Sequence, residues 1–273
     1  VQSVPPYENT DLRPFENALP FRLTGAQRRA IDGILEDFRA GRPMSRLVQG
    51  DVGCGKTMVA AAAAYCAAKN GRQTALMAPT EILARQHYER LEPLFSALGI
   101  SCALLTGSMT PAQKRECRRS IAQGEAEVVI GTHALLTETT VFSRLGLVIA
   151  DEQHRFGVAQ RTALLEKGER PHLLLMSATP IPRTLALLMY GDLEVSVIDE
   201  LPPGRQEVET FLVSESYRAR LNGFIRRQAE EGHQSFIVCP AIEEGETDGL
   251  KAAEQWAQTL QQQATEQMAC GEV

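Results

Sequence analysis

The chain of 273 residues, 44% of them hydrophobic, can hold one complete domain and part or all of a second. Its longest apolar stretch, 58–68, is shorter than the roughly 20 residues of a membrane span. With no secretory signal pattern and no C-x-x-C pair among six cysteines, we expect a cytoplasmic protein without a zinc ribbon or disulfide framework. The net charge is −6, but residues 201–273 hold 12 of the 34 acidic and 6 of the 28 basic residues, so the preceding part is balanced.

Short apolar runs alternate with helical patterns along most of the chain, which is typical of successive βαβ units and a parallel sheet. The runs are apolar throughout, as in strands that are covered on both faces. One helical pattern carries the basic group Lys114–Arg119, which by itself is typical of a solvated helix face. We expect strands at 45–50, 74–79, 101–107, 126–132, 146–151, 171–179 and 193–199, and helices at 25–40, 56–69, 81–97, 111–122, 157–167 and 181–190.

The stretch DELPPGR, residues 199–205, interrupts this alternation, because its prolines and glycine can continue neither a helix nor a central strand. Beyond it we expect a strand at 207–213, a helix at 215–231 and a strand at 234–240, too few strands for an α/β domain. The predicted organisation is an N-terminal linker (1–18), a first α/β domain with a mainly parallel central sheet flanked by helices (19–200), and an incomplete second domain (201–273).

GDVGCGKT, residues 50–57, matches the phosphate-loop pattern G-x-x-x-x-G-K-[ST], with a predicted strand before it and a helix after it. Backbone amides in such a loop hold phosphates at a helix N-terminus, where the helix dipole favours negative charge. Lys56 is expected to reach the β and γ phosphates and Thr57 to supply an oxygen to Mg²⁺, whereas Cys54 is expected to be passive. The predicted nucleotide-binding residues are Gly50, Gly53, Cys54, Gly55, Lys56 and Thr57.

Asp151 and Glu152 end a buried predicted strand of the same sheet. Ligands of open α/β folds lie outside the carboxyl ends of the strands, and two acids there are costly without a cation. We predict that Asp151 holds the Mg²⁺ of a bound nucleotide and that Glu152 orients and deprotonates the attacking water. His154 could suggest a metal site with His133 or His172, but no ligand spacing supports zinc.

Seven segments in order, among them LVQGDVGCGKT, MAPTEILARQHY, IGTHALL, DEQHRFGVAQR and MSATPIPRTLAL, make the chain resemble the RecG family of superfamily 2 helicases. The resemblance covers about residues 19–245. It implies two RecA-like domains, ATP and Mg²⁺ as cofactors, and action on branched DNA in repair and recombination. Transcription-repair coupling factor shares GDVG and DEQHRFGV, so a translocase of that type stays an alternative.

The resemblance also implies roles for individual residues. Gln27 matches the glutamine that reads adenine, with Phe21 or Leu23 flanking the base. Arg183 and Thr184 lie just beyond the coupling segment, where capping of the next helix is an equal alternative. The residues that match nucleic-acid backbone contacts are Thr80, Glu81, Thr106, Gly107, Thr132 and His133. The residues that match the coupling of hydrolysis to movement are Gln153, His154, Ser177, Ala178 and Thr179.

The chain departs from the family pattern in two places. Neither the wedge domain with its OB-fold nor the arginine finger of a complete second motor domain has a counterpart in the sequence. We therefore expect a monomer that binds Mg-ATP, hydrolyses it weakly and does not unwind DNA alone; single-stranded DNA-binding protein is an expected partner of the parent enzyme. The rival hypotheses are a nucleotide-dependent DNA- or protein-binding module and, disfavoured because no guanine motif occurs, a phosphate-loop kinase or GTPase.

Overall fold

A computed structural model describes residues 4–152, 158–179, 193–201 and 208–239, with two short pieces at 257–258 and 261–262. The chain divides into two compact units, 1–206 and 207–273. This division lies next to the DELPPGR stretch. In the part of the chain that the structure describes, no helix is long and apolar enough to cross a bilayer.

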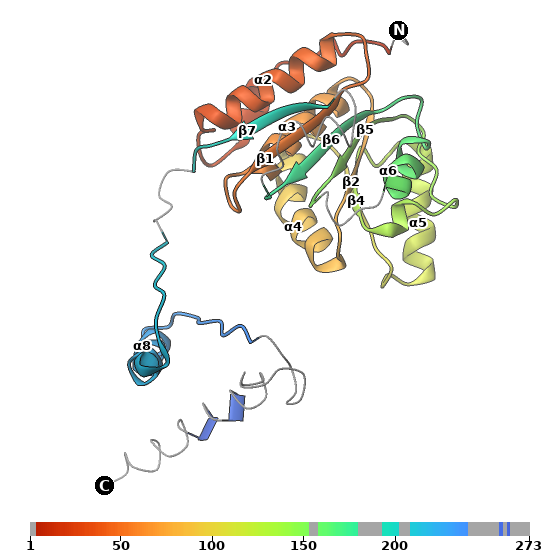
Figure 1. The fold of residues 1–273 in the computed structure, drawn as a ribbon. Coiled ribbons are helices and arrows are strands. Elements are labelled where there is room, and N and C mark those ends of the chain that lie inside the picture. The colour runs from red at the N-terminus through yellow and green to blue at the C-terminus, as the bar shows by residue number, and fades with distance from the viewer. Residues whose placement is uncertain are drawn as a thin grey trace. The chain divides into compact units, whose positions relative to one another are not determined.

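A seven-stranded sheet with the order β3-β4-β2-β5-β6-β1-β7 forms the centre of the first unit (Figure 1). All of its strand pairs are parallel, which confirms the predicted α/β class. Gln49 is in register with Ser177, and Leu175 with Ala150, so β1, β6 and β5 end at the same edge. The strands are β1 Ser45–Gly50, β2 Gln73–Met77, β3 Cys102–Leu105, β4 Val128–Gly131, β5 Leu145–Ala150, β6 His172–Ser177 and β7 Glu194–Ile198.

Helices cover both faces of this sheet. One core cluster joins α2, α3 and α4 to one face, and another joins α5 and α6 to the other (Figure 1). Successive strand residues alternate between the clusters, as Leu47 and Val48 do, which explains why the strands are apolar throughout. The helices of this unit are α1 Arg13–Ala18, α2 Gly25–Arg39, α3 Lys56–Lys69, α4 Glu81–Ala97, α5 Pro111–Gln123 and α6 Val158–Leu165, and the 3-10 helix η1 is His133–Leu135.

Local sequence signals fix several helix starts. Thr24 and Thr110 each form a capping box with a glutamine three residues later, which satisfies backbone N–H groups that have no partner inside the helix. Thr80 caps α4 by accepting a hydrogen bond from the Leu83 N–H. These caps place the first turns of α2, α4 and α5 where the sequence predicts them.

The N-terminal segment, predicted to be a linker over 1–18, is packed against the domain from residue 4 onward. Phe15 in α1 is fully buried, and the Tyr7 hydroxyl donates a hydrogen bond to the Gly146 carbonyl at 3.1 Å. The Tyr7 ring lies 4.7 Å from that of Phe38 and 4.9 Å from that of His172. These contacts are distant in sequence and follow no local periodicity, so the pattern of residues 1–18 does not reveal them.

Two strands predicted in the second unit are wrong as far as the structure describes them. Residues 208–214 and 233–239 are irregular, between them stands only η3 Glu215–Tyr217 with α8 Arg218–Glu230, and Phe211 and Phe236 are exposed. A strand needs a neighbour to satisfy its backbone groups, and no strand pairing is formed by the described residues of this unit. The predicted helix 181–190 lies outside the described residues.

Candidate nucleotide- and nucleic-acid-binding sites

The phosphate loop connects the end of β1 to the start of α3. It passes through two left-handed positions, Gly53 at φ 80° and Gly55 at φ 90°, which glycine adopts without a steric penalty. At Gly50 an added Cβ would lie 2.6 Å from Cys54 Sγ and 2.8 Å from the Ile198 carbonyl oxygen. The loop is therefore closely packed around Gly50, and the Cys54 side chain is buried.

Lys56 contacts the backbone of this loop. Its ammonium group donates hydrogen bonds to the carbonyls of Gly50 at 2.6 Å and Asp51 at 3.0 Å. The N-cap of α3 is Gly55, which has no side chain to cap the first N–H groups of the helix. A helix N-terminus of this kind beside a lysine suits an anion such as a phosphate chain.

Gln27 holds the phosphate loop to the start of α2. Its side-chain oxygen accepts a hydrogen bond from the Thr24 N–H at 3.0 Å, and its amide nitrogen donates to the Cys54 carbonyl at 2.8 Å. Only 2% of Gln27 is exposed. Next to it, a pocket of about 570 Å³ is lined by Phe21 and Leu23, the residues expected to flank a base. Contact of Gln27 with adenine stays a prediction.

Asp151 and Glu152 follow β5 at the same edge of the sheet. One Asp151 oxygen, Oδ1, accepts a hydrogen bond from the Glu152 N–H at 3.0 Å, and the other, Oδ2, lies 2.7 Å from His87 Nε2. Glu152 has a φ of 50°, a left-handed conformation that costs a non-glycine residue about 1–3 kcal/mol and is concentrated at functional sites. His87 was not predicted, because nothing in its local sequence relates it to Asp151.

The ends of β1, β6 and β5 bring the predicted nucleotide and coupling residues to one place. Neighbouring strands lie about 4.8 Å apart, so the ends of β1 and β5 are separated by about 10 Å across the sheet, with the end of β6 between them. There, Ser177 Oγ accepts a hydrogen bond from the Thr179 N–H at 3.2 Å, with Ala178 beside them. Carboxylate and hydroxyl oxygens beside a glycine loop fit Mg²⁺ and a phosphate chain. Gln153 and His154 lie outside the described residues.

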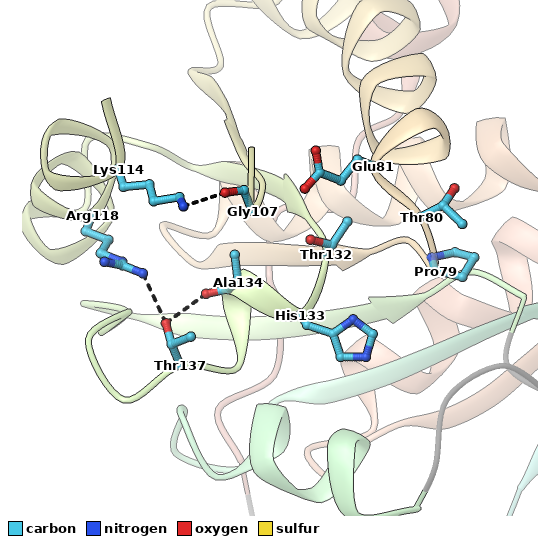
Figure 2. Close-up of a pocket in the computed structure, with 10 residues that line it drawn as sticks. All are labelled: Pro79, Thr80, Glu81, Gly107, Lys114, Arg118, Thr132, His133, Ala134 and Thr137. Atoms are coloured by element: carbon cyan, nitrogen blue, oxygen red, sulfur yellow. Dashed lines mark hydrogen bonds between the residues drawn. The ribbon is translucent and has the colours of Figure 1, made fainter. Parts of the chain in front are cut away.

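A second site lies at the ends of β2, β3 and β4 (Figure 2). It is a pocket of about 470 Å³, and five of the six residues predicted to contact nucleic acid line it. The sixth, Thr106, is fully buried and is not among the lining residues. The lining residues are Pro79, Thr80, Glu81, Gly107, Lys114, Arg118, Thr132, His133, Ala134 and Thr137.

Two basic residues of α5 complete this pocket, and the sequence interpretation missed them. Lys114 donates a hydrogen bond to the Gly107 carbonyl at 2.5 Å, and Arg118 lies 3.3 Å from the hydroxyl of Thr137 (Figure 2). They are four residues apart and so share one face of the helix. Arg115 and Arg119 are exposed instead. The four-residue spacing was the sequence signal for this pair, because it separates Lys114 and Arg118 from Arg115 and Arg119 on the helix surface.

Glu81, an acidic residue that lines the pocket, is hydrogen-bonded to the loop that follows β3. Its carboxylate accepts a hydrogen bond from the Ser108 N–H at 2.9 Å. Hydrogen bonding to Ser108 lowers the pKa of Glu81 below its ordinary value, so the group is anionic at neutral pH. Because an anion repels phosphate, Glu81 is better suited to fixing the 107–108 turn than to contacting a nucleic-acid backbone.

Comparison with known proteins relates the chain to helicases. The model of the DEAD/DEAH box helicase family matches residues 24–188. The ATP-dependent DNA helicase RecG of Synechocystis sp. is 53% identical over 242 residues, which are 89% of this chain and 29% of that relative. RecG of Aquifex aeolicus is 52% identical over 244 residues, 89% of this chain and 31% of the relative.

Solved structures give the same result. A structure of RecG bound to a three-way DNA junction superposes with a TM-score of 0.73 at 47% identity, over 82% of this chain and 30% of that one. The helicase MrfA, at 16% identity and a TM-score of 0.65 over 97% of this chain and 43% of that one, shares the fold. The resemblance to RecG and the RecA-like fold are thereby confirmed, although the chain spans less than a third of the two RecG relatives' length. Since the family model matches more than half of the sequence, the chain belongs to the DEAD/DEAH box helicase family.

Proposed function

We propose that this chain is the nucleotide-binding part of an ATP-dependent DNA motor of the RecG type. The observation that carries the proposal is that two separate sites lie along the carboxyl edge of the sheet. The phosphate loop and the paired carboxylates follow β1 and β5, whereas the basic pocket follows β2, β3 and β4. The relatives' names support DNA as the track, and the RecG structure on a three-way junction supports branched DNA. Replication fork reversal and Holliday junction branch migration in repair and recombination are the proposed tasks of the whole enzyme.

In the proposed reaction, the loop backbone at Gly53–Lys56 holds the phosphates, and the Lys56 ammonium group exchanges carbonyl oxygens for β and γ phosphate oxygens. Thr57 and Asp151 are the residues that would hold Mg²⁺, which neutralises phosphate charge when bound. Glu152 orients a water molecule and takes its proton while the water oxygen bonds to the γ phosphorus and ADP leaves. Glu152 adopts its left-handed backbone conformation two residues after the end of β5.

At the second site, the proposed ligand is the sugar–phosphate backbone of DNA. Lys114 and Arg118 supply positive charge, and Thr80, Thr132 and Thr137 supply hydroxyl groups around the same pocket. Such groups bind phosphate oxygens without reading bases. This suits a motor that has to move over any sequence.

Binding of a fluorescent ATP analogue to the 273-residue chain tests the nucleotide site. Lys56→Ala should lower the affinity about 10- to 100-fold, because each hydrogen bond to a charged group contributes about 1.5–3 kcal/mol. Glu152→Gln should keep the affinity and lose turnover, since only the proton acceptor is removed. In a nucleotide-dependent binding module with incidental hydrolysis, Glu152→Gln would leave the function, which is partner binding, unchanged.

The extent of activity is part of the same proposal. The 273 residues contain no G-R-x-G-R stretch of the kind that supplies an arginine finger, which is worth about 10³–10⁵ in rate for related phosphoryl transfers. We expect these residues alone to be monomeric, to hydrolyse ATP slowly and not to unwind DNA; contact with single-stranded DNA-binding protein is proposed only for the whole enzyme. Robust DNA-stimulated turnover by the chain alone would contradict the expected weak activity.

A further inference from the structure

A hydrogen bond between side chains joins α4, whose first residue lines the second pocket, to the end of β5. His87, in the second turn of α4, places Nε2 2.7 Å from Asp151 Oδ2. The two side chains are only 11% and 13% exposed. The contact connects residues 64 positions apart, and His87 lies outside the phosphate loop and outside the strand end that carries Asp151.

The chemistry of this contact fixes its direction. An ionised carboxylate offers only acceptor atoms, so His87 Nε2 carries the hydrogen and donates it to Asp151. The other Asp151 oxygen accepts a hydrogen bond from the Glu152 N–H. Both oxygens are therefore held, and rotation of the carboxylate about its Cβ–Cγ bond breaks at least one bond. A charge-assisted bond that is shielded from water is among the stronger hydrogen bonds in proteins.

The helix that carries His87 is itself firmly anchored. Its buried residues Ala84, His87, Leu91 and Phe95 recur every three or four positions, and the three apolar ones pack into the core cluster with α3. At its start, Thr80 caps the first turn and Glu81 accepts a hydrogen bond from the Ser108 N–H. The packing of α4 and the anchoring of its first turn thus fix the helix position from which His87 reaches Asp151.

We propose that His87 is a positioning residue that fixes the Asp151 carboxylate in the orientation in which it takes up the Mg²⁺ of a bound nucleotide. The inference rests on the proposed function, because it assigns Asp151 to the Mg-nucleotide site. Partners that orient a metal-binding side chain typically change metal affinity about 10- to 100-fold when they are removed. The role belongs to a residue of α4, outside both segments that form the nucleotide site.

A magnesium titration tests this role without relying on turnover. Binding of the fluorescent ATP analogue to the 273-residue chain is measured over a range of Mg²⁺ concentrations. His87→Leu, which removes the donor, should raise the Mg²⁺ concentration at half-saturation about tenfold or more, while the affinity without Mg²⁺ stays unchanged. His87→Gln, whose amide can reach Asp151, should stay close to the wild type. Tyr88→Phe, the neighbouring change on α4, should have no effect.

The possible results separate this inference from the function on which it rests. Wild-type Mg²⁺ dependence in His87→Leu, or equal impairment in His87→Gln and His87→Leu, would overturn it. If His87→Leu does not melt cooperatively, His87→Asn replaces it, because its amide is one methylene too short to reach Asp151 and should show the same shift. A wild-type chain that does not bind the analogue with or without Mg²⁺ would overturn the proposed function, and the role of His87 with it.

Discussion

The two edges of the central sheet differ in backbone conformation and in the exposure of their polar groups. At the carboxyl edge, Glu152 and two loop glycines have left-handed backbones, and polar groups line open pockets. At the amino edge, Tyr7, Phe38 and His172 form a buried aromatic cluster in which the Tyr7 hydroxyl and His172 Nδ1 have partners inside the protein. Tyr7 donates to the Gly146 carbonyl, and His172 Nδ1 accepts a hydrogen bond from the Met44 N–H at 3.0 Å.

This difference separates stability from function. Strained backbone and open polar groups persist only where the surrounding structure holds them, and the sealed amino edge contributes to that support. Substitutions at the amino edge should therefore lower the free energy of unfolding and leave ligand affinity unchanged. Substitutions at the carboxyl edge should lower ligand affinity and leave the free energy of unfolding unchanged.

The largest expected effect is at the amino edge. Phe38 is fully buried, with ring centroids of Tyr7 and His172 each 4.7 Å away. Phe38→Ala should lower the free energy of unfolding by about 3–5 kcal/mol, because it removes apolar contacts and leaves a cavity. Urea denaturation measures this loss, and Phe38→Leu is the milder control, at less than about 1.5 kcal/mol. A tenfold loss of nucleotide affinity in folded Phe38→Leu would break the separation between the edges.

The second effect is a dependence of stability on pH. Burial lowers the pKa of His172 from 6.5 to about 4, so the folded protein keeps this imidazole neutral. The unfolded chain takes up a proton below about pH 6.5, and the folded chain does so only near pH 4. The stability from neutral His172 is therefore complete above pH 6.5 and is lost as the pH falls towards 4, by about 3 kcal/mol in total.

The matched control for this effect is His172→Asn, which keeps an acceptor for the Met44 N–H but does not titrate. Urea denaturation of both proteins between pH 7 and pH 4 gives the difference, which cancels the contribution of carboxylates that the two share. The wild type should lose more stability than the variant across this range. If the free energy of unfolding falls equally with pH in the two proteins, His172 is not buried in its neutral form.

Much of the fold follows from local signals. The predicted strand 45–50 and helix 81–97 coincide with β1 and α4, because the strand is apolar on both faces and Thr80 caps the helix. The phosphate loop is equally local, since its eight residues carry the glycines and the lysine that its geometry requires. The strand at 207–213 failed for the complementary reason, because apolar composition does not supply a pairing partner.

The parts that could not be predicted depend on contacts between distant segments. His87 meets Asp151 only because α4 packs beside the sheet, and Tyr7 meets His172 only because the N-terminal segment crosses the amino edge. Lys114 and Arg118 had a usable signal in their four-residue spacing, but the spacing does not say which face of the helix meets the pocket. Sequence reasoning thus recovers the motif-bearing half of the carboxyl edge better than its basic half.

The smallest expected effect tests that basic half. Lys114→Gln combined with Arg118→Gln should weaken binding of a single-stranded oligonucleotide about tenfold and reduce the slope of log affinity against log salt by about 1.4, since two phosphate contacts are lost. Affinity for the ATP analogue should stay unchanged, because no hydrogen bond of Lys114 or Arg118 involves the phosphate loop. The matched control is Arg115→Gln with Arg119→Gln, which removes the same charge from the exposed face of α5. If both double variants lose oligonucleotide affinity equally, the pocket has no special role and general attraction to α5 accounts for binding; a loss confined to the first places a nucleic-acid backbone at the ends of β2, β3 and β4.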